Sequence, residues 1–184
     1  MQQVKGAVLK SRLAFVEEIA GKSGVDRVLG ALSAEDRKAL GLVLPPIWYP
    51  FPLGERLDGA IVKVIGGGNP RFFEKLGEES ATRNLSTLHR MYLTPGDPHA
   101  FLEKAPAIYR SYYDTGHREY ERTGPQSGTL TTHEAVTFSA PDCLTVVGWY
   151  RKALEMCGAT NVSVIEEECR AKGGEVCRYS VAWK

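Results

Sequence analysis

The C-terminal end of the chain contains the pattern that most restricts its fold. Between Glu175 and Trp183, apolar residues alternate with polar or small ones: Cys177, Tyr179, Val181 and Trp183 against Arg178, Ser180 and Ala182. An alternation with a period of two residues predicts a β-strand with one buried face. The segment Asn161 to Glu168 precedes it, and Gly173 and Gly174 lie between the two, so we expect an antiparallel hairpin. The fold must therefore include an antiparallel sheet that is covered on one side.

Upstream of Gly116, apolar residues recur at helical spacing and predict mainly helices. Capping residues, glycines and prolines divide this region into the segments Ser11 to Ala20, Val25 to Leu32, Ala34 to Leu40, Leu53 to Ile65, Pro70 to about Met91, and Pro98 to Tyr112. We expect a kink at Pro106 in the last of these helices. The stretch Leu44 to Pro52 contains four prolines and cannot form a regular helix. We expect it to lie over the core as an apolar strap.

Beyond Gly116 the pattern changes from helix to strand. The segments His117 to Arg122 and Thr129 to Phe138 are rich in residues that favour strands, and a helix is expected from Ser139 to Gly158. The order predicts an α+β fold, in which an N-terminal helical bundle packs on a C-terminal antiparallel sheet of about four strands. We expect one domain over residues 1–184, with 1–113 mainly helical and 117–184 arranged as strand, strand, helix, strand, strand.

Composition excludes several classes of function. The chain has 184 residues, with 23 Lys and Arg against 22 Asp and Glu, so no basic surface for nucleic acid is indicated. The uncharged stretch Leu42 to Gly54 is much shorter than the roughly 20 apolar residues of a membrane-spanning helix. The first ten residues contain no continuous apolar run of the kind found in secretory signals. We therefore expect a cytoplasmic protein without a membrane span.

Two short motifs resemble catalytic or phosphate-binding signatures, but both are incomplete. Gly21-Lys22-Ser23 is similar to the end of a phosphate-binding loop, but Val16 stands where the first glycine of that loop is required. In Gly124 to Gly128, the serine is one place too late for a nucleophile elbow. Since no catalytic set of residues emerges, we expect a protein that is not an enzyme.

Cysteines and histidines do not form a recognisable metal motif. Cys143, Cys157, Cys169 and Cys177 lack a C-x-x-C pair, and His89, His99, His117 and His133 lack the i, i+4 spacing of helical zinc ligands. Reduced, partly buried thiols are expected rather than disulfides. Cys169 and Cys177 would face each other across the final hairpin as half of a site, although burial as small apolar residues is the alternative we favour. We predict no metal site and keep His99, Cys169 and Cys177 as its only candidates; Glu166 to Glu168 are expected at a solvated rim.

Apolar and aromatic side chains of the helical region are the candidate ligand-binding residues. Such side chains pack a core in most cases, but a set of this size can also line an apolar pocket. The candidates are Trp48, Phe72, Phe73, Leu88, Tyr92, Tyr109 and Tyr112.

The segment Trp149 to Trp183 resembles the end of the 4-vinyl-reductase-like domain. That domain closes with a helix, a glycine, a strand, a cysteine, a glycine-containing turn, a second cysteine and a last strand, and Gly158, Cys169, Gly173 or Gly174, and Cys177 occupy these places here. Its superfamily also contains the TRAPP vesicle-tethering subunits and the heme-based nitric-oxide-sensing domain. More closely, the start VKGAVLKSRLAFVEEIAG, the WYPF at 48–51 and the AIYRSYYDTG at 107–116 resemble a protein family known chiefly from myxobacteria. This resemblance covers residues 4–183.

The resemblance implies a homodimer that encloses an apolar cavity for a small hydrophobic ligand or an acyl chain. We therefore expect a non-enzymatic regulatory module that binds a small apolar molecule in a helix-lined cavity, with a signalling protein as a further partner. A dimeric scaffold without a ligand is one alternative, and a heme-based gas sensor that uses His99 is another.

The heme alternative departs from the motif that the resemblance implies. Heme sensors of this superfamily hold the heme propionates with a Y-x-S-x-R motif. Tyr109 and Ser111 match it, but Tyr113 stands in the place of the arginine. The carboxylates would lose their bidentate partner, so the leading expectation is a protein without a cofactor. The acylated cysteine of the TRAPP subunits is also unmatched, since all four cysteines lie beyond the helical region.

Overall fold

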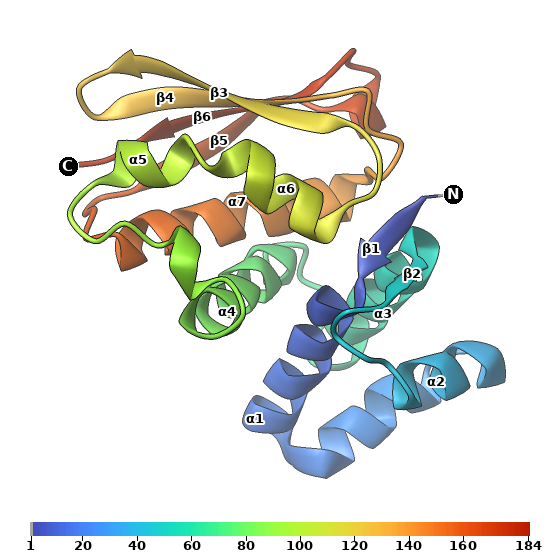
Figure 1. Ribbon diagram of the computed structural model, residues 1–184. Coiled ribbons are helices and arrows are strands. Elements are labelled where there is room, and N and C mark those ends of the chain that lie inside the picture. The colour runs from blue at the N-terminus through green and yellow to red at the C-terminus, as the bar shows by residue number, and fades with distance from the viewer. Residues whose placement is uncertain (1) are drawn as a thin grey trace.

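Helices make up most of the N-terminal part of the chain, and four strands lie towards its C-terminal end (Figure 1). The computed structural model describes residues 2–184. In chain order the elements are β1 (Gln3–Lys5), α1 (Gly6–Gly30), α2 (Ala34–Gly41), β2 (Trp48–Pro50), α3 (Phe51–Val64), α4 (Phe72–Ser86), η1 (Arg90–Tyr92), α5 (Pro98–Leu102), α6 (Ala105–Tyr112), β3 (His117–Gly124), β4 (Ser127–His133), α7 (Ala140–Met156), β5 (Ser163–Glu168), η2 (Arg170–Lys172) and β6 (Cys177–Ala182). The predicted α+β class, with a helical bundle and a four-stranded antiparallel sheet, is confirmed.

The strands form the order β3-β4-β6-β5, and every neighbouring pair is antiparallel. Leu130 pairs with Tyr179 and Thr132 with Cys177, so buried residues of β4 and β6 lie on one face of the sheet. The final hairpin is therefore as expected. Strand β4 was expected to end at Phe138 but ends at His133. Glu134 has a positive φ of 54°, which an extended strand does not accommodate.

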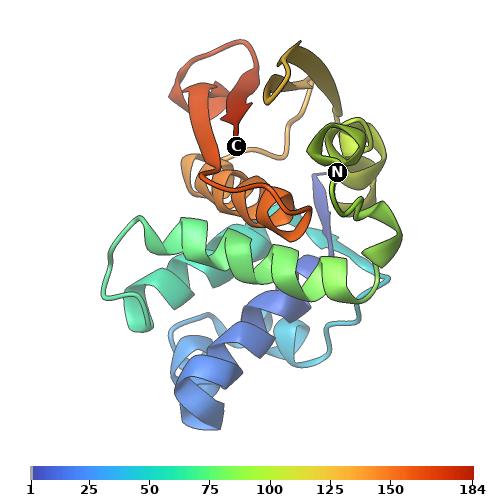
Figure 2. The ribbon, with the colours of Figure 1, turned by 90° about the vertical axis from the view of Figure 1, so that its left-hand side faces the viewer.

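The inner face of this sheet is covered by helices in successive layers. Helices α5, α6 and α7 lie against the sheet, α4 packs on α7, and α1 lies beyond α4 (Figures 1 and 2). α4 and α7 approach each other very closely, since a Cβ atom added at Gly148 would lie 1.9 Å from the carbonyl oxygen of Glu74. A Cβ atom at Gly77 would lie equally near the carbonyl oxygen of Thr145. Glycine at these two positions brings α7 into contact with α4.

One expectation about the helices is confirmed and two need correction. As predicted, the helical segments before and after Gly21 are separate: they meet at a kink within α1, where Gly21 is non-helical with a φ of 65°. The helix expected to reach about Met91 ends at Ser86. Pro106 lies in the first turn of α6 instead of kinking a longer helix, because a first-turn residue needs no N–H donor.

The expected strap contains a strand that the sequence did not predict. β2 pairs with β1 in a two-stranded antiparallel ribbon, with Val4 opposite Tyr49. The extended backbone that prolines favour also suits an edge strand, where a missing N–H costs little. This ribbon fixes the N-terminus beside α3.

Buried apolar side chains form two clusters. One lies between the sheet and helices α4 to α7, and the other lies among α1, α2, α3 and the start of α4. α4 takes part in both, since Phe73 and Leu76 belong to the second cluster and Ala81 and Leu85 to the first. Within residues 2–184, the helices lack the length and apolar character that crossing a bilayer requires.

Candidate functional site

A cavity of about 40 Å³, which we call the central cavity, lies where α1, α4, α6, β3 and α7 meet. A buried water needs roughly 10–15 Å³ of such space, so this cavity has room for about three waters or one very small molecule. Its lining residues are Val8, Arg12, Ser80, Ile108, Tyr109, Tyr112, Tyr113, Arg118, Thr145, Val146, Trp149 and Tyr150. Elements of both hydrophobic clusters therefore contribute to its wall.

Arg118 is the most unusual residue of this wall. It is 6% exposed because it lies on the inner face of β3, opposite Thr132, and its Nε donates to the Thr132 hydroxyl at 2.9 Å. Among residues 2–184, no carboxylate lies within 4 Å of its guanidinium, and its other two nitrogens make no hydrogen bond. The guanidinium lies over three aromatic rings, with centroids at 4.9 Å (Tyr109), 5.3 Å (Tyr150) and 5.8 Å (Tyr179). These cation–π contacts partly offset the cost of burying an unpaired charge.

Two tyrosine hydroxyls at the cavity also lack partners. Tyr150 is 1% exposed and Tyr112 is 6% exposed, and neither hydroxyl has a hydrogen-bond partner among the described residues. The pKa of Tyr112 is raised by burial, so this hydroxyl keeps its proton and remains a donor. A buried polar group without a partner typically costs about 1–3 kcal/mol. The wall thus carries three unused donor groups.

Other polar side chains of the wall are already occupied. Arg12 pairs with Asp58 at 3.0 Å and donates to the carbonyl oxygen of Leu76 at 2.8 Å. Tyr109 donates to the carbonyl oxygen of Thr115 at 2.8 Å. These residues shape the cavity, and each already has hydrogen-bond partners within the fold.

Asp142 is an acidic group in the neighbourhood of Arg118. Both residues line an adjoining cavity of about 10 Å³. The Asp142 carboxylate accepts a hydrogen bond from Tyr113 at 3.0 Å, and burial raises the pKa of Asp142 to about 7. A carboxyl group that is partly protonated near neutral pH and lies beyond ion-pair distance leaves the charge of Arg118 largely uncompensated.

The structure brings two of the seven predicted ligand-binding residues to the central cavity. These two are Tyr109 and Tyr112. The other five lie elsewhere. Trp48 is on β2, with the ammonium group of Lys5 over its ring, and Phe72 packs against Phe15. Phe73 belongs to the cluster around α1, α2 and α3, Tyr92 is on η1, and Leu88 is exposed on the surface. Sequence reasoning missed Arg118 and Tyr150, although Arg118 shares the period-two face of β3 with Tyr120.

His99, the heme ligand of the alternative prediction, lies at the start of α5 and not at the central cavity. Its Nε2 lies 2.7 Å from the carbonyl oxygen of Pro125, and its Nδ1 lies 2.5 Å from the Tyr120 hydroxyl. Because a carbonyl oxygen can only accept, Nε2 donates to Pro125 and Nδ1 accepts from Tyr120. The ring packs edge-on against Trp183, with centroids 4.7 Å apart. Both nitrogens are therefore used within the fold.

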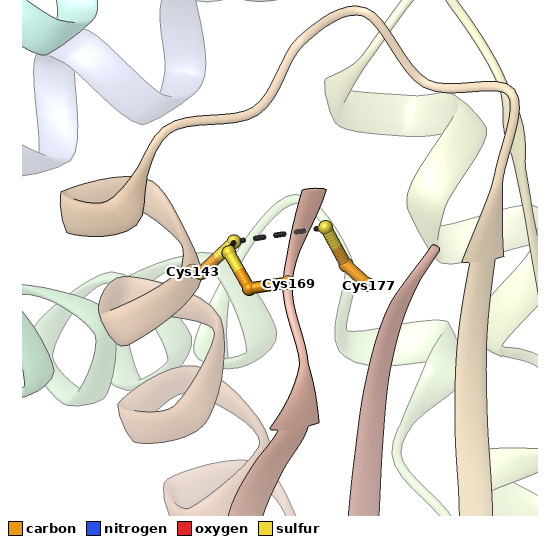
Figure 3. Close-up of side chains that lie close together, drawn as sticks. All are labelled: Cys143, Cys169 and Cys177. Atoms are coloured by element: carbon orange, nitrogen blue, oxygen red, sulfur yellow. Dashed lines mark hydrogen bonds between the residues drawn. The ribbon is translucent and has the colours of Figure 1, made fainter. Parts of the chain in front are cut away.

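A second candidate site is a cluster of three buried thiols at one end of the sheet. Cys143 on α7, Cys169 after β5 and Cys177 on β6 point toward one another (Figure 3). The Cys143 sulfur lies 3.4 Å from that of Cys169 and 3.8 Å from that of Cys177. In a tetrahedral site with Zn–S bonds of about 2.3 Å, two sulfur ligands lie roughly 3.8 Å apart. The cluster therefore has the spacing of three ligands of one metal ion.

Glu166 lies beside the Cys169 thiol, and its Oε2 forms an ion pair with Lys172. It pairs with Tyr179 across the hairpin and so faces inward, and its Oε1 is buried without a hydrogen-bond partner among the described residues. Burial raises the pKa of the Cys169 thiol, and the Glu166 carboxylate raises it further. Glu166 was expected at a solvated rim. Its position two residues after the buried Val164 was the signal for an inward side chain.

The electrostatics of the cluster favour a thiolate at Cys177. A hydrogen bond from the Cys143 thiol lowers the pKa of Cys177, and the same contact raises the pKa of Cys143. The three clustered thiols supply three of the four ligands that a structural zinc ion takes. Cys169 and Cys177 were considered as half of a site, although burial as small apolar residues was the favoured prediction. Cys143 was missed because a ligand on a distant helix has no spacing signature.

One further group of possible metal ligands lies on the surface of the sheet. His117 and His133 stack across β3 and β4 with centroids 5.1 Å apart, and Glu119 lies 3.5 Å from each. These three side chains are partly or fully exposed to solvent. They lack the enclosure that the cysteine cluster provides.

Comparison with known proteins adds a family and a set of similar folds. The sequence model of the family described as "Protein of unknown function (DUF2378)" matches residues 72–184, and no curated protein matches the chain. An Fe(II) unliganded H-NOX protein mutant from K. algicida is 16% identical, with a TM-score of 0.74 over 98% of this chain and 96% of that one. An H-NOX protein from S. oneidensis, solved in the Fe(II)NO ligation state, is 13% identical, with a TM-score of 0.69 over 98% and 99%. The chain therefore has an H-NOX-like fold.

The residues of this chain do not fit a heme. An H-NOX structure that concerns heme distortion has a TM-score of 0.70 at 12% identity, covering 98% of this chain and 95% of that one. In this chain, however, both nitrogens of His99 are hydrogen-bonded, and His99 does not line the central cavity. A cavity of about 40 Å³ is also far too small for a porphyrin.

Proposed function

The chain belongs to the DUF2378 family, and from this membership and its H-NOX-like fold we propose a non-enzymatic sensor module that binds a small molecule in the central cavity. The observation that carries the proposal is a cavity in the middle of the fold whose wall holds unused polar groups, the Tyr112 and Tyr150 hydroxyls. Buried polar groups are normally satisfied, so such a wall is suited to a ligand that supplies the missing partners.

A ligand at this position can influence the packing of several helices. The central cavity is bounded by α1, α4, α6 and α7, and α4 also joins the two hydrophobic clusters. A molecule that fills the cavity stabilises the arrangement in which the wall surrounds it. The ligand changes the surface of the module only if it binds one arrangement of these helices more tightly than another. The difference between its two binding free energies sets the largest shift that it can produce.

Binding of small probes to a cavity-filled variant tests this function. Acetamide, propanol, propionamide and propionate are added in turn, and the thermal midpoint of unfolding is measured. Val146→Ile adds a methyl group to the cavity wall, and Val62→Ile makes the same change in α3, away from the cavity. We expect at least one probe to raise the midpoint of the wild-type protein and of Val62→Ile but not of Val146→Ile. No shift in the wild type, or a shift that survives in Val146→Ile, contradicts the proposal.

The heme alternative has its own test. Hemin is added to the purified protein, and its visible spectrum is compared with that of His99→Ala. We expect no Soret band that depends on His99, because both of its ring nitrogens are hydrogen-bonded. A band that is lost in His99→Ala would establish the heme sensor instead.

Several expectations stay predictions. They are the homodimer, the signalling partner, and the relationship to 4-vinyl reductases, TRAPP subunits and myxobacterial proteins. The homodimer is tested by analytical ultracentrifugation of the purified chain. A sedimentation coefficient that corresponds to twice the mass of 20.3 kDa is expected, and that of a monomer contradicts the dimer.

A further inference from the structure

The unused groups at the central cavity are all hydrogen-bond donors, or can act as donors. Arg118 offers the N–H groups of its two terminal nitrogens, and Tyr112 and Tyr150 each offer a hydroxyl. Guanidinium can only donate, and its planar fork matches the two oxygens of a carboxylate. A neutral ligand would leave the buried charge of Arg118 without a counter-charge.

The rest of the wall restricts the ligand further. Val8, Ile108, Val146 and Trp149 present apolar surface to the cavity, which suits a short hydrocarbon group and disfavours an inorganic oxyanion that is polar on all sides. The volume of about 40 Å³ limits the molecule to roughly the size of acetate or propionate, given that about three waters would occupy the same space. Longer acyl chains exceed the cavity.

We propose that the central cavity binds a short monocarboxylate whose carboxylate group is held by Arg118, Tyr112 and Tyr150. The apolar end of the ligand lies against the aliphatic wall and Trp149. This inference rests on the proposed function, because it names the ligand class of the same cavity. It also departs from the sequence-based prediction of a purely apolar ligand.

Isosteric probes separate this inference from the proposed function. Propionate and propionamide have almost the same shape, but only propionate carries a negative charge. Each is titrated into ¹⁵N-labelled protein at constant ionic strength, and the indole N–H signals are followed by NMR. Trp149 lines the cavity and Trp48 lies on β2, so the signal of Trp149 reports binding and that of Trp48 serves as an internal control.

We expect propionate to shift the Trp149 signal with a Kd at least about 10-fold lower than that of propionamide, as expected for a hydrogen bond to a charged group. Arg118→Met should abolish this preference. Arg122→Met is the matched control, since Arg122 lies on the same strand but is exposed and bonds only to the Gly124 carbonyl oxygen. Equal binding of the two probes, or a preference that survives in Arg118→Met, overturns the inference and leaves the proposed function intact. If neither probe moves the Trp149 signal, the inference fails, and the other probes then decide the proposed function.

Tyr150→Phe protects the test against misfolding of the arginine variant. It removes only a hydroxyl that has no partner among the described residues, so the protein without ligand should be at least as stable as wild type. We expect the Kd for propionate to rise several-fold in Tyr150→Phe, while the Kd for propionamide changes less. An unchanged Kd for propionate would show that the hydroxyl is not part of the site.

Discussion

At the scale of single residues, the cysteine cluster allows a quantitative expectation about metal content. We expect the purified protein to contain about one zinc ion per chain, and Cys143→Ser to lose most of it, because the three clustered sulfurs supply most of the ligands of one ion. Metal content is measured by mass spectrometry. Cys157→Ser is the matched control, since Cys157 is also buried but lies outside the cluster.

Removal of the metal provides an independent readout for the same residues. Binding to the folded state alone stabilises a protein, so a chelator should lower the melting temperature of the wild type and of Cys157→Ser but leave that of Cys143→Ser unchanged. Stoichiometric zinc in Cys143→Ser, or a wild-type protein that holds no metal and does not respond to the chelator, would show that the thiols are only packed together.

Residue by residue, the sequence predicts what depends on local pattern and misses what depends on long-range contact. The inward side of Cys177 and Tyr179 follows from alternation, and alternation from Val164 would also have placed Glu166 inside. Nothing in the sequence places Cys143 beside Cys169, because that contact depends on how α7 crosses the hairpin. The unpaired charge of Arg118 was likewise invisible, since pairing is a property of the folded state.

At the scale of elements, the contact between α4 and α7 depends on glycine. A Cβ atom at Gly148 would meet the backbone of α4 at 1.9 Å, and backbone cannot move aside as the end of a side chain can. We expect Gly148→Ala to lower the free energy of unfolding by about 1–3 kcal/mol, the usual cost of overpacking. Urea denaturation followed by tryptophan fluorescence measures the change.

Gly59→Ala in α3 is the control for helix propensity. A Cβ atom there has no neighbour within 4 Å, so the substitution should raise the free energy of unfolding by about 0.5–1 kcal/mol, because alanine restricts the unfolded chain. If Gly148→Ala leaves the free energy of unfolding unchanged, α4 and α7 are not in such close contact. The sequence predicted both helices but gave no sign of which glycines allow their approach.

The boundaries of elements show where local signals stop being sufficient. The expected helix starts at Ala34, Pro98 and Ser139 agree with the structure to within one residue. The side chains of Ser33, Asp97 and Ser139 cap these helices, since each accepts a hydrogen bond from the backbone N–H three residues later. The pairing of β1 with β2 joins residues that are far apart in the chain, and neither three-residue strand has a pattern of its own. Such a ribbon is stabilised by its tertiary surroundings.

At the scale of the whole molecule, α4 determines whether the two hydrophobic clusters unfold together. The first half of α4 contributes Phe73 and Leu76 to the N-terminal cluster, and its second half contributes Ala81 and Leu85 to the C-terminal one. A helix that is buried in both clusters cannot lose its contacts on one side without exposing apolar surface on the other. The single domain predicted from the sequence therefore requires one cooperative transition.

Coincidence of two probes tests this cooperativity in one variant. In Trp48→Phe, fluorescence comes from Trp149 and Trp183 and reports the C-terminal cluster, whereas far-UV circular dichroism also reports α1, α2 and α3. We expect the two urea transitions to coincide, and Leu76→Ala to move both to lower urea by the same amount, because Leu76 is fully buried and its loss typically costs about 2–5 kcal/mol. If the dichroism changes first and fluorescence responds only at higher urea, the N-terminal helices form a separate unit. A ligand in the central cavity, which is bounded by elements of both clusters, would then act on the contact between two domains instead of on the core of one.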